Sequence, residues 1–361
     1  IILGMFMVIL SIVCFPVSKL IAFPLQIILK ILIKIIELIS KIPFGNYTVK
    51  TPWLIVVFLT YAIIATLIHN KKRITKILTM VTLIIFVVMQ VCTFINIDGK
   101  LKIYFIDVGQ GDSMLVKTVR GKNILIDGGG SKDPDYDIGE KILVPYLLDR
   151  RIKTLDYVII SHFDEDHATG VAQILGKIDV SSIILTRQLE ENDIYRHILS
   201  IAKEKKIKLI YVKEGDVLKI GGIKISIIHP ENKLMINNPM NNNSIVCKVE
   251  YNSFSMLLTG DIEMEAEELI LRKNINLKAD VLKVAHHGSK TSTTGEFLKA
   301  INPKVALIGV GKNNNFGHPS NEVIQRLKEN GTRIYRTDEN GEISITVNKK
   351  GRIIKIQRCI T

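Results

Sequence analysis

The chain has 361 residues, enough for two domains, and a formal net charge of +13. Residues 1–97 are dominated by Ile, Leu, Val and Phe, whereas residues 98–361 have the mixed composition of a soluble domain, which excludes one uniform domain. The first 99 residues hold 9 Lys and Arg against 2 Asp and Glu, and the remainder holds 39 against 33. The later part is therefore only moderately basic, which permits contact with a polyanion without requiring it.

The apolar runs before residue 98 predict membrane helices. Residues 53–69 and 77–95 carry no charge, and each approaches the ~20 residues that cross a hydrocarbon core. The short basic segment between them predicts a hairpin with a cytoplasmic tip, which would put the following domain on the extracellular side of the cell membrane. Residues 24–43 place Lys and Glu on one helical face, which suits a helix in the membrane interface or one packed against a larger membrane domain.

Beyond residue 98, short apolar strands are interleaved with helical segments, which predicts an α/β sandwich of two layered sheets flanked by helices. No complete GxGxxG or Walker motif is present, so a nucleotide-binding loop is not indicated. The predicted helices are 138–149, 167–176, 191–204, 262–273, 294–300 and 320–329. The predicted strands are 102–107, 114–119, 123–127, 157–160, 182–186, 208–212, 224–228, 244–250, 254–259, 280–285, 304–309, 333–335 and 342–347.

The segment SHFDEDH directly follows the apolar strand that ends at residue 160. His162, Asp164, Asp166 and His167 are four potential metal ligands within six residues. Because the chain turns at a strand end, their side chains can converge on one point, and imidazole nitrogens with carboxylate oxygens suit a pair of divalent cations. A polar loop in which Asp166 caps the next helix is the alternative, but a cap needs only one such residue.

Three later motifs also place metal-binding side chains at strand ends. Asp261 ends the segment LLTGD and could bridge two metals or cap the next helix. His286 and His287 lie in VAHHGS, and His318 lies in GHPS just before a predicted helix. Five of the eight histidines fall in these motifs, a segregation that scattered core histidines would not show.

In their order along the chain, these motifs and Asp127 in the early DGG resemble the metallo-β-lactamase superfamily over residues 101–357. The segments IDVGQGDS, ILIDGGG, SHFDEDHATG, LLTGDIE, LKVAHHGSKTST and GHPS are similar to the extracellular nuclease domain of the ComEC DNA-uptake channel family. The resemblance implies an αββα fold for residues 98–361. It also implies that residues 1–97 are membrane helices from a larger channel domain, of which the chain is a C-terminal portion.

The resemblance also implies a site with two divalent ions, Zn²⁺ or Mn²⁺. It places metal ligands at His162, Asp164, Asp166, His167, Asp261 (bridging), His286 and His318, and catalytic groups at Asp166, His286, His287 and Ser289. Three departures concern the ligands: Asp164 stands where most of the superfamily has His, Thr169 replaces a Gly, and the place of a third ligand motif holds Asn241, Asn242 and Asn243. Carboxylate-rich ligation is what makes Mn²⁺ an alternative to Zn²⁺.

The implied function is that of a membrane-tethered deoxyribonuclease, which degrades one strand during DNA import together with other DNA-uptake proteins. Single strands are the expected substrate, held through phosphate contacts without sequence readout, with Lys290, Lys283 and Lys312 as candidates. One rival function is an extracellular phosphodiesterase that acts on phosphorylcholine or cell-wall polymer. The other is a channel subunit whose hydrolase fold serves only for docking.

Overall fold

The structure, a computed structural model, divides into two compact units, residues 1–52 and 53–361. Of the predicted span 53–69 the structure describes only residue 61, and of the predicted span 77–95 it describes residues 77 and 79–84. Within the described ranges, no helix combines the length and the apolar character that crossing a bilayer demands. The described residues are 8, 11, 15–40, 61, 74, 77, 79–84, 99–131, 136–312 and 314–359.

In the first unit, α2 (Phe15–Ser40) covers most of the segment expected to form an interfacial helix. Its apolar side chains are largely exposed, including Phe23, Ile28 and Leu32. The helix therefore carries a large apolar surface, and its location in a membrane interface stays a prediction.

In the second unit, one sheet has eight strands. It begins as an antiparallel meander of β1, β2 and β3, and then continues in parallel through β4, β5 and β6. The strand order is β15 (Ile353–Cys359), β14 (Glu342–Val347), β1 (Leu101–Phe105), β2 (Met114–Lys117), β3 (Asn123–Ile126), β4 (Thr154–Ile159), β5 (Asp179–Leu185) and β6 (Lys208–Tyr211).

The other sheet has seven strands, and β10 to β13 run parallel in it. Parallel strands end at the same edge of a sheet, so the loops that follow them gather there. The strand order is β13 (Arg333–Arg336), β12 (Val305–Ile308), β11 (Val281–Lys283), β10 (Phe254–Leu258), β9 (Val246–Tyr251), β8 (Ile223–His229) and β7 (Val217–Ile220).

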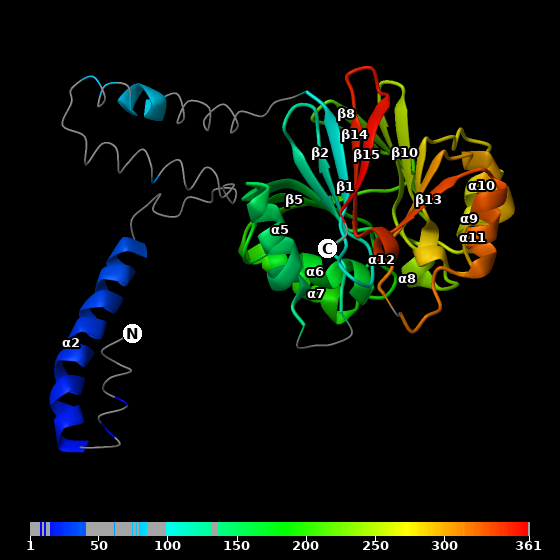
Figure 1. Ribbon diagram of the computed structural model, residues 1–361. Coiled ribbons are helices and arrows are strands. Elements are labelled where there is room, and N and C mark those ends of the chain that lie inside the picture. The colour runs from blue at the N-terminus through cyan, green and yellow to red at the C-terminus, as the bar shows by residue number, and fades with distance from the viewer. Residues whose placement is uncertain are drawn as a thin grey trace. The chain divides into compact units, whose positions relative to one another are not determined.

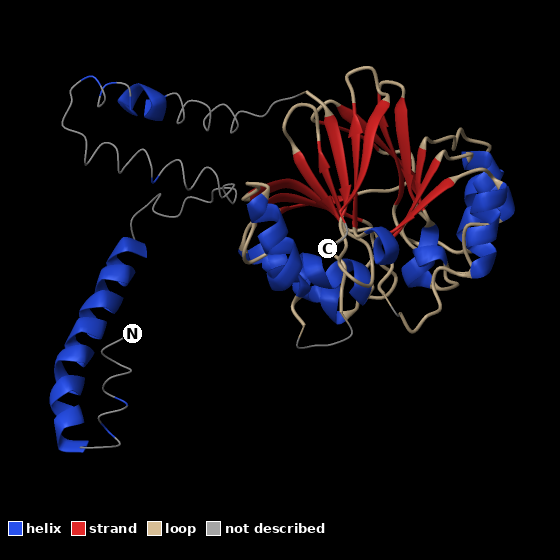
Figure 2. Cartoon of the chain, in the orientation of Figure 1, coloured by secondary structure: helices blue, strands red, loops and turns tan. Residues whose placement is uncertain are grey.

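Three apolar clusters hold these layers together. One lies between the two sheets, and the other two lie under the helices on their outer faces. Figures 1 and 2 show the strands between two groups of helices, which confirms the predicted αββα architecture of this unit. The first group is η1 (Gly139–Leu143), α5 (Val144–Asp149), α6 (Glu165–Ile174) and α7 (Asp193–Glu204); the second is α9 (Met264–Arg272), α10 (Gly295–Ile301) and α11 (Asn321–Glu329).

Two strands were absent from the sequence-based prediction, β7 and β15. Each is the outermost strand of its sheet, and most of its side chains are exposed or partly exposed. An edge strand packs on only one neighbour and tolerates charged residues, so it lacks the apolar signature of a buried strand. Three short helices complete the unit: α8 (Pro239–Asn242), η2 (Ala285–Gly288) and α12 (Thr337–Asn340).

Candidate metal centre

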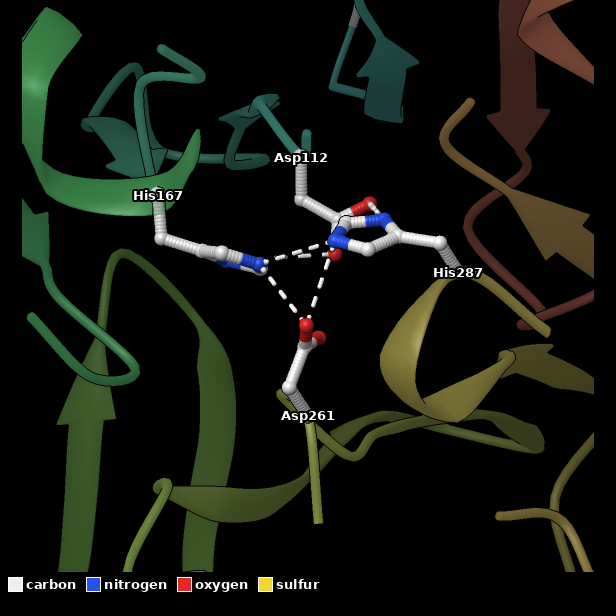
Figure 3. A group of neighbouring side chains, drawn as sticks. All are labelled: Asp112, His167, Asp261 and His287. Atoms are coloured by element: carbon white, nitrogen blue, oxygen red, sulfur yellow. Dashed lines mark hydrogen bonds and ion pairs between the residues drawn. The ribbon is translucent and has the colours of Figure 1, made fainter. Parts of the chain in front are cut away.

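Four buried side chains meet where strands of the two sheets end. The ligand atoms of Asp112, His167, Asp261 and His287 all lie within 4.8 Å of one another. Figure 3 shows both imidazole rings and the two carboxylates pointing toward a common centre. Asp112 lies in the β1–β2 loop, and His167 in the first turn of α6. Asp261 follows β10 and His287 follows β11, so loops of both sheets contribute to this cluster.

The Asp261 carboxylate contacts both imidazole rings of the cluster. Asp261 Oδ2 lies 3.2 Å from His167 Nε2 and 3.1 Å from His287 Nε2. The two Nε2 atoms are themselves 3.2 Å apart. Asp166 adds its Oδ2 at 3.1 Å from His287 Nε2. Nitrogen and carboxylate ligands that crowd one point in this way fit a divalent cation such as Zn²⁺ or Mn²⁺.

Hydrogen bonds on the outer nitrogens orient both rings. His167 Nδ1 lies 3.0 Å from Asp127 Oδ2, and His287 Nδ1 donates to Gly309 O at 2.7 Å. Asp127 in turn accepts from the backbone N and the hydroxyl of Ser161, both at 2.7 Å. Such partners fix the tautomer and the direction of a ligating histidine, leaving each Nε2 aimed at the centre.

Backbone strain accompanies the paired histidines. His286 and His287 both have positive φ, 51° and 53°, which few residues other than glycine adopt. Non-glycine residues in this region cost free energy and cluster at functional sites. The strained turn points His287 into the cluster and leaves His286 partly exposed.

A buried ion pair lies beside the cluster. The Lys283 ammonium contacts the Asp112 carboxylate, lies 3.0 Å from Asp261 Oδ1, and donates to Gly260 O at 2.8 Å. One oxygen of Asp261 therefore faces the lysine, and the other faces the imidazoles. Lys283 was a candidate for contact with a DNA backbone, and its burial shows that this assignment was wrong. The exposed Lys290 and Lys312 remain candidates.

The carboxylates govern the charge of the buried histidines. Burial disfavours the imidazolium of His287, but Asp261 and Asp112 outweigh burial and raise its pKa to about 10. Burial also opposes the charge of His167, yet Asp261 and Asp127 raise its pKa well above the usual value. The pKa of Asp261 is well below its usual range, because the nearby cationic groups outweigh burial. The site therefore concentrates negative charge, which a bound cation would neutralise.

His162 and Asp164 stand to one side of this cluster. His162 is buried, its ring centre is 4.1 Å from that of His167, and its Nδ1 is 3.0 Å from Ser161 Oγ. Its Nε2 has no hydrogen-bond partner and lies 3.6 Å from Asp164 Oδ2. A buried nitrogen without a partner beside a carboxylate fits a cation-binding position.

The late histidines pair with each other. The ring centres of His286 and His318 are 5.6 Å apart, and His286 Nδ1 lies 3.5 Å from Glu263 Oε1. Burial lowers the pKa of His286 and lowers that of His318 to about 4, so both rings are neutral near pH 7. Ser289 is buried, and its hydroxyl lies 3.0 Å from Thr291 Oγ1.

The Asn241–Asn243 segment supplies side chains to the surrounding structure. Asn242 Oδ1 accepts from the backbone N of Glu263, and the Asn243 amide binds the backbone of Met235 and Pro239. Asn241 Oδ1 is buried and has no partner in hydrogen bonding. Of the three asparagines, Asn241 is therefore the one whose side-chain oxygen remains unpaired.

Sequence reasoning assigned no role to Asp112, although its GQGDS segment was part of the family resemblance. A Cβ at Gly111, where φ is +101°, would come within 1.9 Å of Asp166 O. Glycine thus lets this loop reach the His/Asp turn, and the backbone N of Asp112 donates to Asp166 O at 3.2 Å. In the sequence, the position of Asp112 directly after this glycine was the signal that could have identified it as a site residue.

The layered sheets and the His/Asp cluster at their ends agree with one protein class. Residues 106–312 match the family model described as "Metallo-beta-lactamase superfamily", and the chain belongs to this superfamily.

Three curated proteins are similar to the chain in sequence, and they confirm the likeness to the ComEC family. ComE operon protein 3 of Bacillus subtilis is 38% identical over 260 residues, which are 68% of this chain and 33% of that protein. Competence protein ComA of Neisseria gonorrhoeae is 29% identical, with shares of 70% and 33%. Recombination protein 2 of Haemophilus influenzae is 31% identical, with shares of 66% and 28%. The matched part thus spans about a third of each relative.

Proposed function

We propose that this chain carries the metal-dependent deoxyribonuclease domain of a membrane protein for DNA uptake. The observation that carries the proposal is the buried cluster of His167, Asp261 and His287, with Asp166 beside it, in a metallo-β-lactamase fold. Relatives named for competence support the DNA-uptake context.

Each side chain would have a distinct part in the reaction. His287, to which the resemblance gave a catalytic role, would take the ligand position expected of His286 and hold one divalent ion with Asp166, His167 and Asp261. His162 and Asp164 would contribute to a second ion, with Asp261 as the bridge and His318 as the late ligand. Such ions, when bound, stabilise the charge that develops on phosphoryl oxygens during hydrolysis. His286 is partly exposed and lines the open cavity, so it would contact the scissile phosphate. Ser289 would assist His286 in this contact.

The charge of the site supports an order in which metal binds before substrate. The cavity over the cluster has a volume of about 540 Å³. Its walls include five carboxylates, which would repel a phosphodiester unless cations are bound. DNA binding in this cavity should therefore depend on metal. The carboxylates belong to Asp164, Glu165, Asp166, Asp193 and Asp261.

Digestion of labelled DNA by the full chain tests the proposal. With Mn²⁺ or Zn²⁺, single strands should be cut without strong sequence preference, and chelation should stop the reaction. Asp166→Ala should abolish cleavage, whereas Asp193→Ala, an exposed acid at the rim of the same cavity, should retain it. If the metal-loaded chain leaves all DNA intact but hydrolyses a choline phosphodiester, the nuclease proposal is wrong. The rival function, hydrolysis of phosphorylcholine or cell-wall polymer, then replaces it.

The proposed location has its own test. The uncharged segments 53–69 and 77–95, with the basic tip between them, motivate an extracellular position for the hydrolase domain. A reporter fused after Thr361 should be active only when it requires export. Activity of a reporter that works only in the cytoplasm would overturn this topology.

A further inference from the structure

A second cavity adjoins the one over the metal centre. Its volume is about 430 Å³, within the range of about 300–1,000 Å³ that small-molecule sites occupy. Gln110 and Phe316 line both cavities and so form part of the boundary between them. A ligand that passes this boundary would have one part at the metal centre and the next part in the second cavity.

The two cavities differ in chemistry. No acidic side chain is found among the described residues that line the second cavity, whereas five carboxylates line the first. Aromatic and apolar groups come from Tyr136, Ile142 and Phe316, amides come from Gln110 and Asn315, and one cation comes from Lys312. Flat apolar surfaces next to amides suit a neutral planar ring with polar edges, and the lysine suits a nearby phosphate.

Phe316 is placed to act as a stacking surface. Its ring is nearly parallel to that of His318, at an angle of 12° with centres 5.9 Å apart. About half of the residue is exposed, and it borders both cavities. Gln110 Oε1 accepts from the backbone N of Gly311 at 3.3 Å, which ties the boundary to the loop after β12.

We propose that the second cavity binds one nucleobase of a DNA strand, stacked on Phe316, while the adjoining phosphodiester lies at the metal centre. This inference rests on the proposed nuclease function and specifies its substrate. A base in a duplex is already stacked and paired, so it would have to leave the helix to enter this cavity. The site therefore selects single strands.

A labelled oligothymidylate with one abasic position tests the inference on the full, metal-loaded chain. Stacking of one base on an aromatic side chain contributes about 1–3 kcal/mol, so cleavage at one phosphate beside the abasic position should fall about 5- to 150-fold relative to the intact oligonucleotide. Phe316→Ala and Phe316→Leu should remove this discrimination, and Phe316→Trp should keep it. Ile354→Ala, which shortens an exposed side chain on edge strand β15, is the matched control and should behave as the parent protein.

The possible results separate the two proposals. If the parent protein cuts every phosphate of the abasic strand as fast as in the intact strand, the base-binding cavity is refuted while the nuclease stands. Discrimination that persists in Phe316→Ala refutes the role of Phe316 in the same way. If the intact oligonucleotide is not cut at all, the nuclease function fails, and the base-binding cavity fails with it.

Discussion

The two sides of the metal centre differ in how firmly the protein holds the ligands. On the inner side, His167, Asp261 and His287 each have a second partner, namely Asp127, Lys283 and the backbone of Gly309. We call His162 and Asp164 the outer side. There, Ser161 Oγ lies 3.0 Å from His162 Nδ1, but the Asp164 side chain is 44% exposed, so the carboxylate is the loosely held ligand.

The difference indicates two unequal cation positions. Ligands that are already oriented lose little conformational freedom when they bind, so preorganisation raises affinity. The inner side should therefore hold its ion tightly, and the outer side should hold a more labile one. Three predictions test this comparison and a fourth concerns a buried histidine outside the centre; they run from the largest expected effect to the smallest.

The largest effect should come from the buried lysine of the inner side. Lys283→Met would remove the nearest cation from the buried Asp112 carboxylate, which should lower the free energy of unfolding by about 3–5 kcal/mol. Chemical denaturation of the metal-free chain measures the loss. Adding Asp112→Asn should restore part of the stability, because the uncompensated charge is then gone. Equal stability of the single and double variants would contradict this account.

Next comes the carboxylate proposed to be shared by both sides. Asp261→Asn should lower cleavage by about 10²–10³-fold, the effect of removing a group that stabilises charge in a transition state. Elemental analysis should also find at least one ion fewer per chain than in the parent protein. Asp280→Asn, an acid that forms a surface ion pair with Lys304, is the control and should retain the full metal content.

A pair of variants compares the two sides directly. Asp127→Asn would disturb the support of His167 and should weaken the inner ion about 10–100-fold, the usual effect of removing the partner of a metal-ligating histidine. Asp164→Asn should affect only the outer ion. Titration with a competing chelator distinguishes these effects, and identical titration curves for both variants would mean that the sides are equivalent.

The smallest effect concerns a histidine outside the centre. His229 is buried, donates to Asn242 O at 2.6 Å, and has its pKa lowered to about 4, chiefly by burial. Below the usual pKa, the unfolded chain binds a proton that the folded chain rejects, so acid reduces stability. From about pH 7 to about pH 5.5 this should cost about 1 kcal/mol. His229→Gln keeps a donor and should lack the loss when both chains are unfolded by denaturant.

The sequence alone determined most of the architecture. Alternating apolar strands and helices gave two sheets with helices outside, because buried strands and amphipathic helices leave a periodic apolar pattern. The edge strands β7 and β15 were not predicted, because an edge strand does not require such a pattern. The clustering of His167, Asp261 and His287 at strand ends was visible for the same reason: parallel strands of a sheet end at one edge.

Only the tertiary structure decided which of these side chains meet. Lys283 and Lys290 look alike in the sequence, yet one is buried against Asp112 and Asp261 and the other is exposed. Asp112 lies in a loop whose partner, Asp166 in the first turn of α6, is distant along the chain. The local sequence pattern indicates which residues are buried and with what periodicity. The partners of a buried charge depend on how separate strands pack, and this follows from the folded arrangement of both sheets.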